Sequence, residues 1–196
     1  MIDSHKNRFS IVIAVYDDAQ LLDEHLPLFL GQNFENGYEV IVVDESSTDD
    51  TPDVLKRFKL NNPHLYTTFL PQYHFQKDRR RISLTIGSKA AKNEWIIMTN
   101  IDFCPPSENW LQELFDNIEP NDELLLGYIR KKAGDVRLKH YDSVDEASST
   151  ISTVVKHRSR LFRLSFRNQD YDFIVVQSSK VHDLLRLFET NKIRRL

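Results

Sequence analysis

Three apolar runs, each followed by acidic or amide side chains, constrain this chain most: Phe9–Val15, Tyr38–Val43 and Trp95–Thr99. The polar residues that follow them are Asp17 and Asp18, Asp44 and Glu45, and Asn100 and Asp102. In an open sheet with helices on both faces, ligands bind at the carboxyl ends of the strands. Acceptor oxygens gathered there suit a nucleotide whose base and hydroxyls donate hydrogen bonds, and whose phosphates arrive with a divalent cation. The pattern therefore predicts a metal-assisted nucleotide site.

The composition is that of an ordinary globular domain. A length of 196 residues suits one domain with a real core. Hydrophobic residues make up 40% and charged residues 28%, which is typical of such a domain. The net charge of -3 gives no reason to expect a nucleic-acid partner. Cys104 is the only cysteine, so an internal disulfide is excluded and a reducing compartment is favoured.

The ends of the chain bear on localisation. The first residues are polar and unlike a signal peptide, and no run approaches the roughly 20 apolar residues of a membrane span. We therefore expect a cytoplasmic protein. The basic C-terminus leaves open a peripheral contact with the inner face of the membrane.

Strand and helix patterns alternate along the first half. A further strand is predicted at Tyr66–Leu70, and helices are predicted at Ala19–Gln32, Asp49–Phe58, Ser83–Lys92 and Glu108–Asn117. Pro27 predicts a kink or an early end of the first helix, and Ser107 predicts an N-cap of the last. The order predicts an α/β fold with a mainly parallel, Rossmann-like sheet, helices on both faces and right-handed crossovers.

The second half has a weaker pattern. Leu124–Arg130 and Asp172–Val176 are predicted as strands, and the apolar spacing from Val181 to Phe188 predicts a C-terminal helix. The polar, serine-rich stretch Lys131–Arg160 predicts a long loop, and such loops are often functional. Since no repeat or linker is visible, we expect a single domain over residues 1–196.

Several segments resemble the family 2 (inverting) glycosyltransferases of the GT-A fold. Phe9–Tyr16 and Glu39–Thr51 are similar to the family's first strand with Pro-x-Tyr-Asn and its second strand ending in Val-Asp-Asp-Gly-Ser-x-Asp. Gly87–Ala91, followed by Glu94–Asp102, resembles the Asn-x-Gly-x-x-x-Ala-x-Gly segment that leads into the Asp-x-Asp motif. The resemblance covers residues 9–130. It implies a nucleotide-sugar-binding half there, and a short acceptor and catalytic-base half over 131–196.

The chain departs from the family's pattern at several of these positions. Ala14 stands where the family has proline, Asp17 where it has asparagine, and Ser46 where it has glycine. Asn100 replaces the first aspartate of Asp-x-Asp. An amide can still accept a hydrogen bond from a ribose hydroxyl, but it is a poorer ligand for a hard cation.

The resemblance implies which residues bind the nucleotide. Asp44 takes the place of the family residue that receives the base, and a carboxylate can accept the imide N–H of uracil; the alternative is a turn or capping aspartate. In the basic run Arg79–Arg81, either Arg80 or Arg81 is expected to bind phosphate, and the alternative is a solvated surface. The other implied nucleotide contacts are Ala14, Tyr16, Asp17, Asn100 and Ile101.

The resemblance also implies a metal and a general base. Asp102 is the expected ligand of Mn²⁺ or Mg²⁺, and the alternative is a turn aspartate. His182 lies downstream of Asp170, where some GT-A enzymes place a metal-binding histidine; the alternative is a surface histidine. Gln169–Phe173 resembles the family's Glu-Asp-x-Asp-Phe, which makes Asp170 the base that takes the acceptor's proton. The alternative for Asp170 is an acidic residue at the start of a strand.

The resemblance thus implies a metal-dependent, hexosyltransferase-like enzyme of polysaccharide biosynthesis. It would move a sugar, with inversion, from a UDP-linked donor to a hydroxyl of a glycan or lipid-linked saccharide acceptor. Asn100 and Gln169 favour the main alternative, a donor-binding relative with weak or no activity. A nucleotidyltransferase shares the architecture, but the residues after Val15 lack its glycine-rich phosphate loop.

Overall fold

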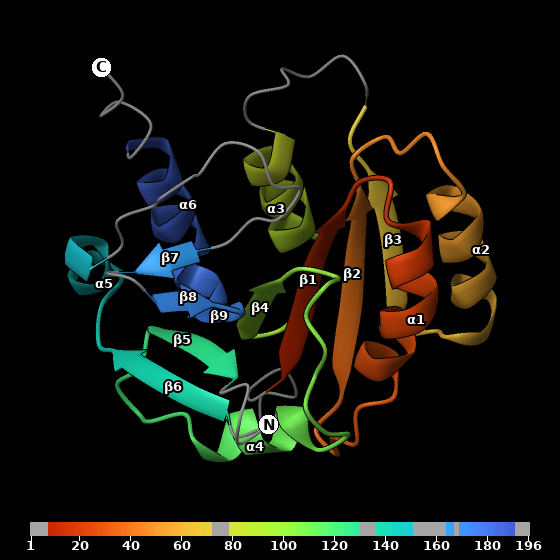
Figure 1. The fold of residues 1–196 in the computed structure, drawn as a ribbon. Coiled ribbons are helices and arrows are strands. Elements are labelled where there is room, and N and C mark those ends of the chain that lie inside the picture. Colours follow the sequence, from red (N-terminus) through yellow and green to blue (C-terminus); the bar gives the residue numbers. More distant parts are fainter. Residues whose placement is uncertain (1–7, 72–78, 130–135, 151–163, 167–168, 191–196) are drawn as a thin grey trace.

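The computed structural model describes residues 8–71, 79–129, 136–150, 164–166 and 169–190, and all structural statements concern these residues. Seven strands form one mixed sheet in the order β3-β2-β1-β4-β9-β5-β6 (Figure 1). They are β1 (Phe9–Val15), β2 (Tyr38–Asp44), β3 (Leu65–Phe69), β4 (Trp95–Thr99), β5 (Leu124–Ile129), β6 (Val136–Tyr141) and β9 (Phe173–Gln177). A separate pair of strands consists of β7 (Leu164–Phe166) and β8 (Gln169–Tyr171).

The sheet has a parallel half and an antiparallel half. β3, β2, β1 and β4 run parallel to their neighbours, as the alternation of strands and helices predicted. β9 runs antiparallel to β4, β5 antiparallel to β9, and β6 antiparallel to β5. Antiparallel neighbours need no helical crossover, which agrees with the weaker helix pattern of the second half.

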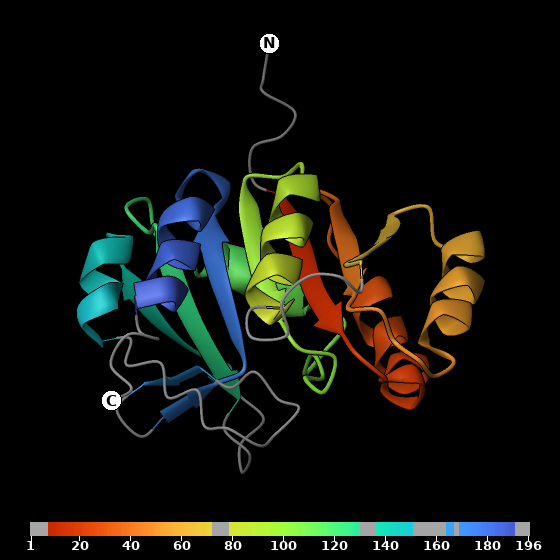
Figure 2. The ribbon, with the colours of Figure 1, turned by 90° about the horizontal axis from the view of Figure 1, so that it is seen from above.

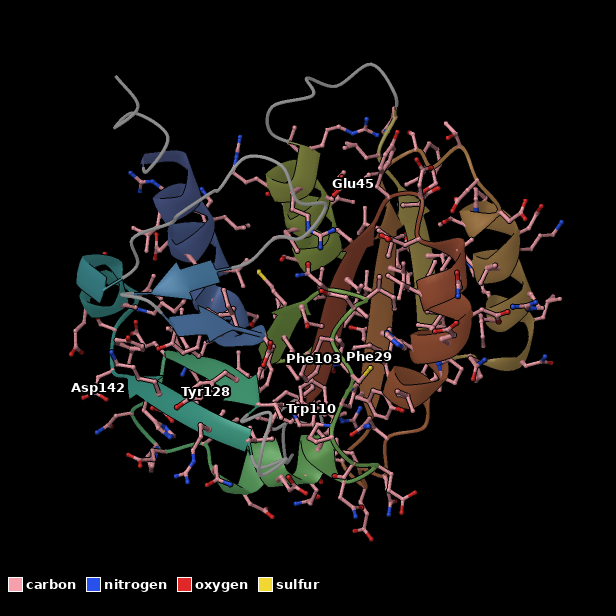
Figure 3. The ribbon with its side chains drawn as sticks, viewed as in Figure 1. Phe29, Glu45, Phe103, Trp110, Tyr128 and Asp142 are labelled. Carbon is pink, nitrogen blue, oxygen red and sulfur yellow. The ribbon has the colours of Figure 1, made fainter. Side chains whose placement is uncertain are left out.

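Helices cover both faces of the sheet, as predicted (Figures 1 and 2). One face packs against α1 (Ala19–Leu30), α2 (Thr51–Asn61) and α4 (Trp110–Asp116), and the other against α3 (Arg79–Ala90), α5 (Val144–Thr150) and α6 (Val181–Thr190). A short 3₁₀ turn, η1 (Ser178–Lys180), precedes α6. The first face carries an aromatic cluster in which the rings of Trp110 and Phe173 lie 5.2 Å apart, with Phe29 and Phe103 beside them (Figure 3).

α3 approaches the sheet unusually closely, because a glycine faces the strands. A Cβ atom on Gly87 would lie 2.4 Å from Val12 Cγ1 and 3.2 Å from Val43 Cγ2, so no side chain fits there without displacing β1. The close contact sets the first turn of α3 over the carboxyl ends of β1 and β2. This turn begins at Arg79, four residues earlier than predicted, so the basic run Arg79–Arg81 is helical.

Of the alternatives predicted at Pro27, an early end of the helix is wrong, and so is the N-cap predicted at Ser107. α1 does not end early at Pro27 but continues to Leu30, and the N–H of Gly31 still bonds to the Pro27 carbonyl oxygen at 2.9 Å. The ring of Pro27 removes one helical donor, yet the buried apolar face of α1 holds the last turn in place. Ser107 is not the N-cap of α4. Asn109 is, and Ser107 Oγ instead accepts a hydrogen bond from the Asn109 N–H.

The predicted loop 131–160 is wrong where the structure describes it, because β6 and α5 lie within it. β6 is a polar edge strand, one side of which carries the half-buried Val136, Leu138 and His140, so its hydrophobic alternation is weak. β7 and β8 have three residues each, too few to produce a periodic pattern. Residues 151–160 lie outside the described residues. Among the helices that the structure describes, none is long and apolar enough to cross a membrane.

Candidate nucleotide site at the carboxyl ends of the parallel strands

The ends of three parallel strands meet at Arg80. Its guanidinium donates one hydrogen bond to the carbonyl oxygen of Ala14 near the end of β1, and another to the side-chain oxygen of Asn100 after β4. Nη1 also lies 3.7 Å from Glu45 Oε1, directly after β2. The structure therefore brings Ala14, Arg80 and Asn100 together at one edge of the sheet, the edge where α/β folds bind ligands.

Burial acts against both charges of the Arg80–Glu45 pair. Burial lowers the pKa of Arg80, and the nearby negative charges of Glu45, Asp18 and Asp102 oppose this. Burial raises the pKa of the Glu45 carboxyl group above its ordinary range, and the charge of Arg80 offsets the rise only in part. Figure 3 shows Glu45 at the end of β2 beside the first turn of α3. The site thus holds a fixed positive charge among several carboxylates.

Asp17 joins the loop after β1 to the loop after β2. Its Oδ1 accepts hydrogen bonds from the Thr48 N–H at 2.7 Å and the Thr48 hydroxyl at 3.3 Å. Its own N–H donates to Ser47 Oγ at 3.0 Å. Asp17 has a φ of 51°, a left-handed conformation that Asp and Asn tolerate better than most residues. This residue therefore shapes the loops around the site.

Asp44 is buried at the end of β2 and is held by its own turn. Its Oδ1 accepts hydrogen bonds from the Ser47 N–H at 2.9 Å and the Ser47 hydroxyl at 2.6 Å. Its Oδ2 makes no hydrogen bond among the described residues, so it can accept one from a ligand. The turn and the nucleotide interpretations of Asp44 are thus compatible, since each uses a different oxygen.

Ser46 stands where the family has glycine, and its backbone shows why glycine suits that position. Its φ is 60°, in the left-handed region that costs an L-residue roughly 1–2 kcal/mol. The Ser46 hydroxyl donates a hydrogen bond to the carbonyl oxygen of Leu70, just after β3. This bond offsets part of the strain.

Tyr16 offers an aromatic surface at the same edge. Its side chain is partly exposed, and the guanidinium of Arg79 lies 5.0 Å from its ring centroid. Aromatic rings in such positions stack with nucleotide bases. Arg81 also lies in the first turn of α3 and is half-buried.

The residues after β4 divide into a buried one and an exposed one. Ile101 is buried, and its carbonyl oxygen contacts His25 Nδ1 at 2.7 Å, so its role in the described structure is packing. Asp102 is exposed, and its negative charge acts on Arg80. It also adds to the effect of burial in raising the pKa of the Cys104 thiol. Asp102 therefore lies at the same edge as Arg80.

Among the described residues, no group of three His, Cys, Asp or Glu side chains is placed to hold a metal ion. One exposed carboxylate, Asp102, still fits the way Mg²⁺ is commonly held, by one or two carboxylates together with substrate phosphates. His182 is not brought to it. β9 runs against β4, so Gln177 pairs with Trp95 at the opposite end of β4, and α6 begins there. The side chain of His182 is 84% exposed.

The segment Gln169–Phe173 does reach the edge where Asn100 lies. Thr99, the last residue of β4, donates from its hydroxyl to the Asp172 carbonyl oxygen at 2.9 Å. The Asp172 carboxylate accepts a hydrogen bond from the Ile129 N–H at 2.8 Å, which ties it to the end of β5. Asp172 thus has a structural role, and the chain carries the backbone of Asp170 two residues before it, in β8.

A small pocket opens between this segment and Arg80. It is lined by Arg80, Asn100, Tyr171 and Asp172 among others, and its free volume of about 10 Å³ holds roughly one water molecule. Burial, with the neighbouring tyrosines, raises the pKa of Tyr171. This volume is far too small for a nucleotide.

Sequence reasoning missed the partners of the predicted residues. The sequence pattern gives Glu45 no role, although neighbouring residues at a strand end point to opposite faces and Glu45 lies toward Arg80 of α3. Thr51 Oγ1 accepts a hydrogen bond from the Asp18 N–H, and the Ser47 hydroxyl contacts both Asp17 and Asp44. The contacts of Ser47 with Asp17 and of Thr51 with Asp18 join residues about 30 positions apart, so no local sequence pattern predicts them.

Solved structures resemble this fold. The mannosyltransferase PcManGT from Pyrobaculum calidifontis in complex with GDP-Man and Mn²⁺ matches with a TM-score of 0.61 and 17% identity, covering 90% of this chain and 46% of that one. S. aureus TarS 1-349 matches with a TM-score of 0.61 and 18% identity, over 90% and 48%. TarS 1-349 in complex with UDP-GlcNAc gives 0.59 and 19%, over 90% and 47%. The present chain spans about half the length of these proteins.

The architecture is shared beyond glycosyltransferases. A 4-diphosphocytidyl-2C-methyl-D-erythritol synthase from Anaerococcus prevotii matches with a TM-score of 0.54 and 10% identity, covering 96% of this chain and 77% of that one. At these identities the likeness shows the fold alone. No curated protein sequence matches the chain significantly. The sequence pattern of glycosyl transferase family 2, however, matches residues 10–180, which is most of the chain. With the GT-A fold and the strand-end site in place, this match establishes that the chain belongs to glycosyl transferase family 2.

Proposed function

We propose that the chain binds a nucleotide-sugar donor, UDP-linked, at the edge where Arg80 joins the strand ends, and transfers the sugar with inversion. The single observation that carries the proposal is the convergence of Ala14, Glu45 and Asn100 on the Arg80 guanidinium. Family membership and the donors bound by the similar structures, UDP-GlcNAc and GDP-Man, support it. The acceptor is a hydroxyl of a glycan or lipid-linked saccharide.

Donor binding follows from the side chains at the edge. The Oδ2 atom of Asp44 accepts the imide N–H of uracil, and Tyr16 provides a face for stacking. Arg80 is held by protein groups and fixes the ends of β1 and β4, while Arg81 is the expected phosphate contact. Asn100 keeps a hydrogen-bonding amide near the ribose.

Asp102 is the residue that would hold Mn²⁺ or Mg²⁺, together with phosphate oxygens of the donor. When bound, such a cation offsets the negative charge that develops on the departing nucleoside diphosphate. The Arg80 guanidinium contributes a fixed positive charge at the same edge, with or without the cation.

Asp170 is the proposed general base. It takes the proton from the acceptor hydroxyl as that oxygen bonds to the anomeric carbon, and the bond from that carbon to the phosphate oxygen breaks on the opposite side. UDP leaves with the bonding electron pair, and the anomeric centre is inverted. The support is the location of the Gln169–Phe173 segment beside the end of β4.

A thermal-shift series tests the donor site. UDP, GDP and CDP, each at millimolar concentration with Mn²⁺, are compared by the melting temperature they give. UDP should raise it most, because a ligand at about 100 times its Kd stabilises the native state by roughly 2.7 kcal/mol. The rise in melting temperature should vanish in Asp44→Asn and persist in Arg57→Gln, because Arg57 only pairs with Asp23 on the surface. A protein that none of the three nucleotides stabilises would contradict the proposal.

Asn100 and Gln169 favour a second candidate, a donor-binding module without turnover. They replace the first aspartate of Asp-x-Asp and the glutamate of the base motif. Release of UDP from UDP-glucose and UDP-GlcNAc, with and without added oligosaccharides, separates the two candidates. Turnover above the buffer rate establishes an enzyme, and nucleotide binding without any turnover establishes a module.

A further inference from the structure

A groove lies between α4 and β6. These two elements lie away from the donor edge, and α4 covers the face of the sheet opposite α3 (Figure 1). Its free volume is about 480 Å³, within the range of small-molecule sites. α4 supplies one wall and the edge strand β6 supplies the other. No residue of the proposed transfer mechanism lines it.

A buried carboxylate holds a histidine ring in place at this groove. The Asp122 side chain is 1% exposed, and its Oδ2 lies 2.9 Å from His140 Nδ1. The same oxygen accepts the Glu119 N–H at 2.7 Å, which fixes the carboxylate in the turn before β5. Since a carboxylate oxygen accepts hydrogen bonds, Nδ1 donates to Asp122, and Nε2 is the other ring nitrogen that can contact a ligand. His140 lines the groove, with 31% of its side chain exposed.

The rest of the lining combines hydrogen-bonding groups with apolar surface. Glu113 comes from α4, Asn117 caps its end, and Arg137 comes from β6. The charges of Glu113 and Arg137 are opposite, so the groove carries no strong net charge. Pro106, Val136 and Leu138 add apolar surface, and the buried Trp110 lies beneath the lining. Donors and acceptors around an apolar strip suit a neutral ligand with many hydroxyl groups, and suit an anion or a purely apolar segment less well.

We propose that this groove is a second binding site, for a short saccharide. It would hold part of the acceptor glycan away from the transfer edge, with His140 Nε2, Asn117 and Glu113 contacting sugar hydroxyls. The choice of a saccharide rests on the proposed glycosyl transfer. The features of the groove are independent of the donor site: its volume, the histidine held by Asp122, and its neutral, mixed lining.

The test uses the indole N–H signals in a ¹H–¹⁵N spectrum of the intact chain. The sequence has two tryptophans, Trp95 and Trp110, so Trp95→Phe assigns both signals. Lactose, cellobiose, N,N′-diacetylchitobiose and α-1,2-mannobiose are each added to about 10 mM, since single-site saccharide contacts are weak. At least one should shift the Trp110 signal saturably while the Trp95 signal stays. No shift of Trp110 with any of the four overturns the proposal.

Variants locate the binding. His140→Ala and Asn117→Ala should each weaken the saccharide response about tenfold. Asn117 is exposed, so its variant keeps the test valid if removal of His140 unfolds the chain. Lys139→Ala is the matched control, because Lys139 lies over the Tyr141 ring, which is in the core cluster of the other face. A response unchanged in Asn117→Ala and His140→Ala overturns the site.

UDP is titrated in a parallel sample. If UDP does not raise the melting temperature but a saccharide moves Trp110, the donor proposal fails and the groove stands. If UDP binds and no saccharide moves Trp110, the groove proposal fails alone.

Discussion

The Arg80 guanidinium donates a hydrogen bond to the side-chain oxygen of Asn100, which joins the first turn of α3 to the end of β4. In the family's Asp-x-Asp motif this position holds an aspartate. Asparagine keeps the bond to Arg80 without adding a further negative charge to an edge that already carries Glu45 and Asp102. The departure from the motif is thus accommodated by a specific contact.

Asn100→Asp should strengthen the dependence of donor binding on a cation. The new carboxylate lies beside Arg80 and one residue removed from Asp102, so it adds charge where Mn²⁺ is expected. The stabilisation by UDP should then be lost on adding EDTA to a greater extent than in the parent chain, as measured by melting temperature. Asn117→Asp, on α4, is the control for added charge. If EDTA lowers the stabilisation by UDP equally in the variant and the parent, residue 100 does not influence cation binding.

Arg80→Gln should destabilise the protein, because it leaves Glu45 buried without its cation. Breaking a fully buried pair costs about 3–5 kcal/mol, and since Arg80 is 24% exposed we expect about 2 kcal/mol. The measurement is the free energy of unfolding in urea. The double variant with Glu45→Gln should recover more than half of the loss. Arg57→Gln, in an exposed pair with Asp23, should change the value by less than about 1 kcal/mol. An equal loss in both arginine variants would contradict the argument.

Glu45 should make stability depend on pH with a sign opposite to that of most carboxylates. Burial raises its folded pKa above the ordinary 4.5, so between the two values the folded state binds more protons than the unfolded state. Its contribution is therefore greatest at low pH and falls as the pH rises through the folded pKa. The stability of the parent relative to Glu45→Gln, followed by urea unfolding from about pH 4 to about pH 8, should decrease. A constant difference would show that Glu45 does not titrate in this range.

The parallel half of the fold was predictable because its strands have a clear sequence pattern. β1 and β4 were predicted with the observed limits, since each is a continuous apolar run buried on both faces. β6 and α5 were missed because an edge strand and a short polar helix bury few side chains. Their positions are decided by contacts such as that of Tyr141 with the core, and sequence periodicity does not record these.

The site was predictable as a set of strand ends, but its connections were not. Asp44, Asn100 and Asp102 follow apolar runs, and parallel strands bring their ends to one edge whatever the loops do. That Arg80, and not a neighbour in the basic run, reaches all three strands depends on where α3 begins and how closely Gly87 lets it approach β1. Similarly, the distance of His182 from this edge follows from β9 running antiparallel, which its sequence does not reveal.

Substitutions at Ser46 should separate backbone strain from hydrogen bonding. Ser46→Ala keeps the left-handed φ and loses the bond to the Leu70 carbonyl oxygen, so it should cost about 1 kcal/mol. Ser46→Gly also loses the bond but relieves strain worth roughly 1–2 kcal/mol, so its stability should be close to that of the parent. Thermal and urea unfolding of both variants give the comparison. A glycine variant less stable than the alanine variant would show that the turn is not strained.

Asp170 and Asp172 should respond differently to the same change. Asp172→Asn weakens the bond that its carboxylate accepts from the Ile129 N–H, so it should lower stability by about 1 kcal/mol and reduce turnover only modestly. Asp170→Asn removes the proposed base, so turnover should fall by about 10²–10⁴-fold while the UDP-induced rise in melting temperature is kept. The two variants are compared by UDP release and by thermal shift. If the larger loss of turnover occurs in Asp172→Asn instead, the base is assigned to the wrong aspartate, because loss of the group that accepts the proton should have the larger effect on turnover.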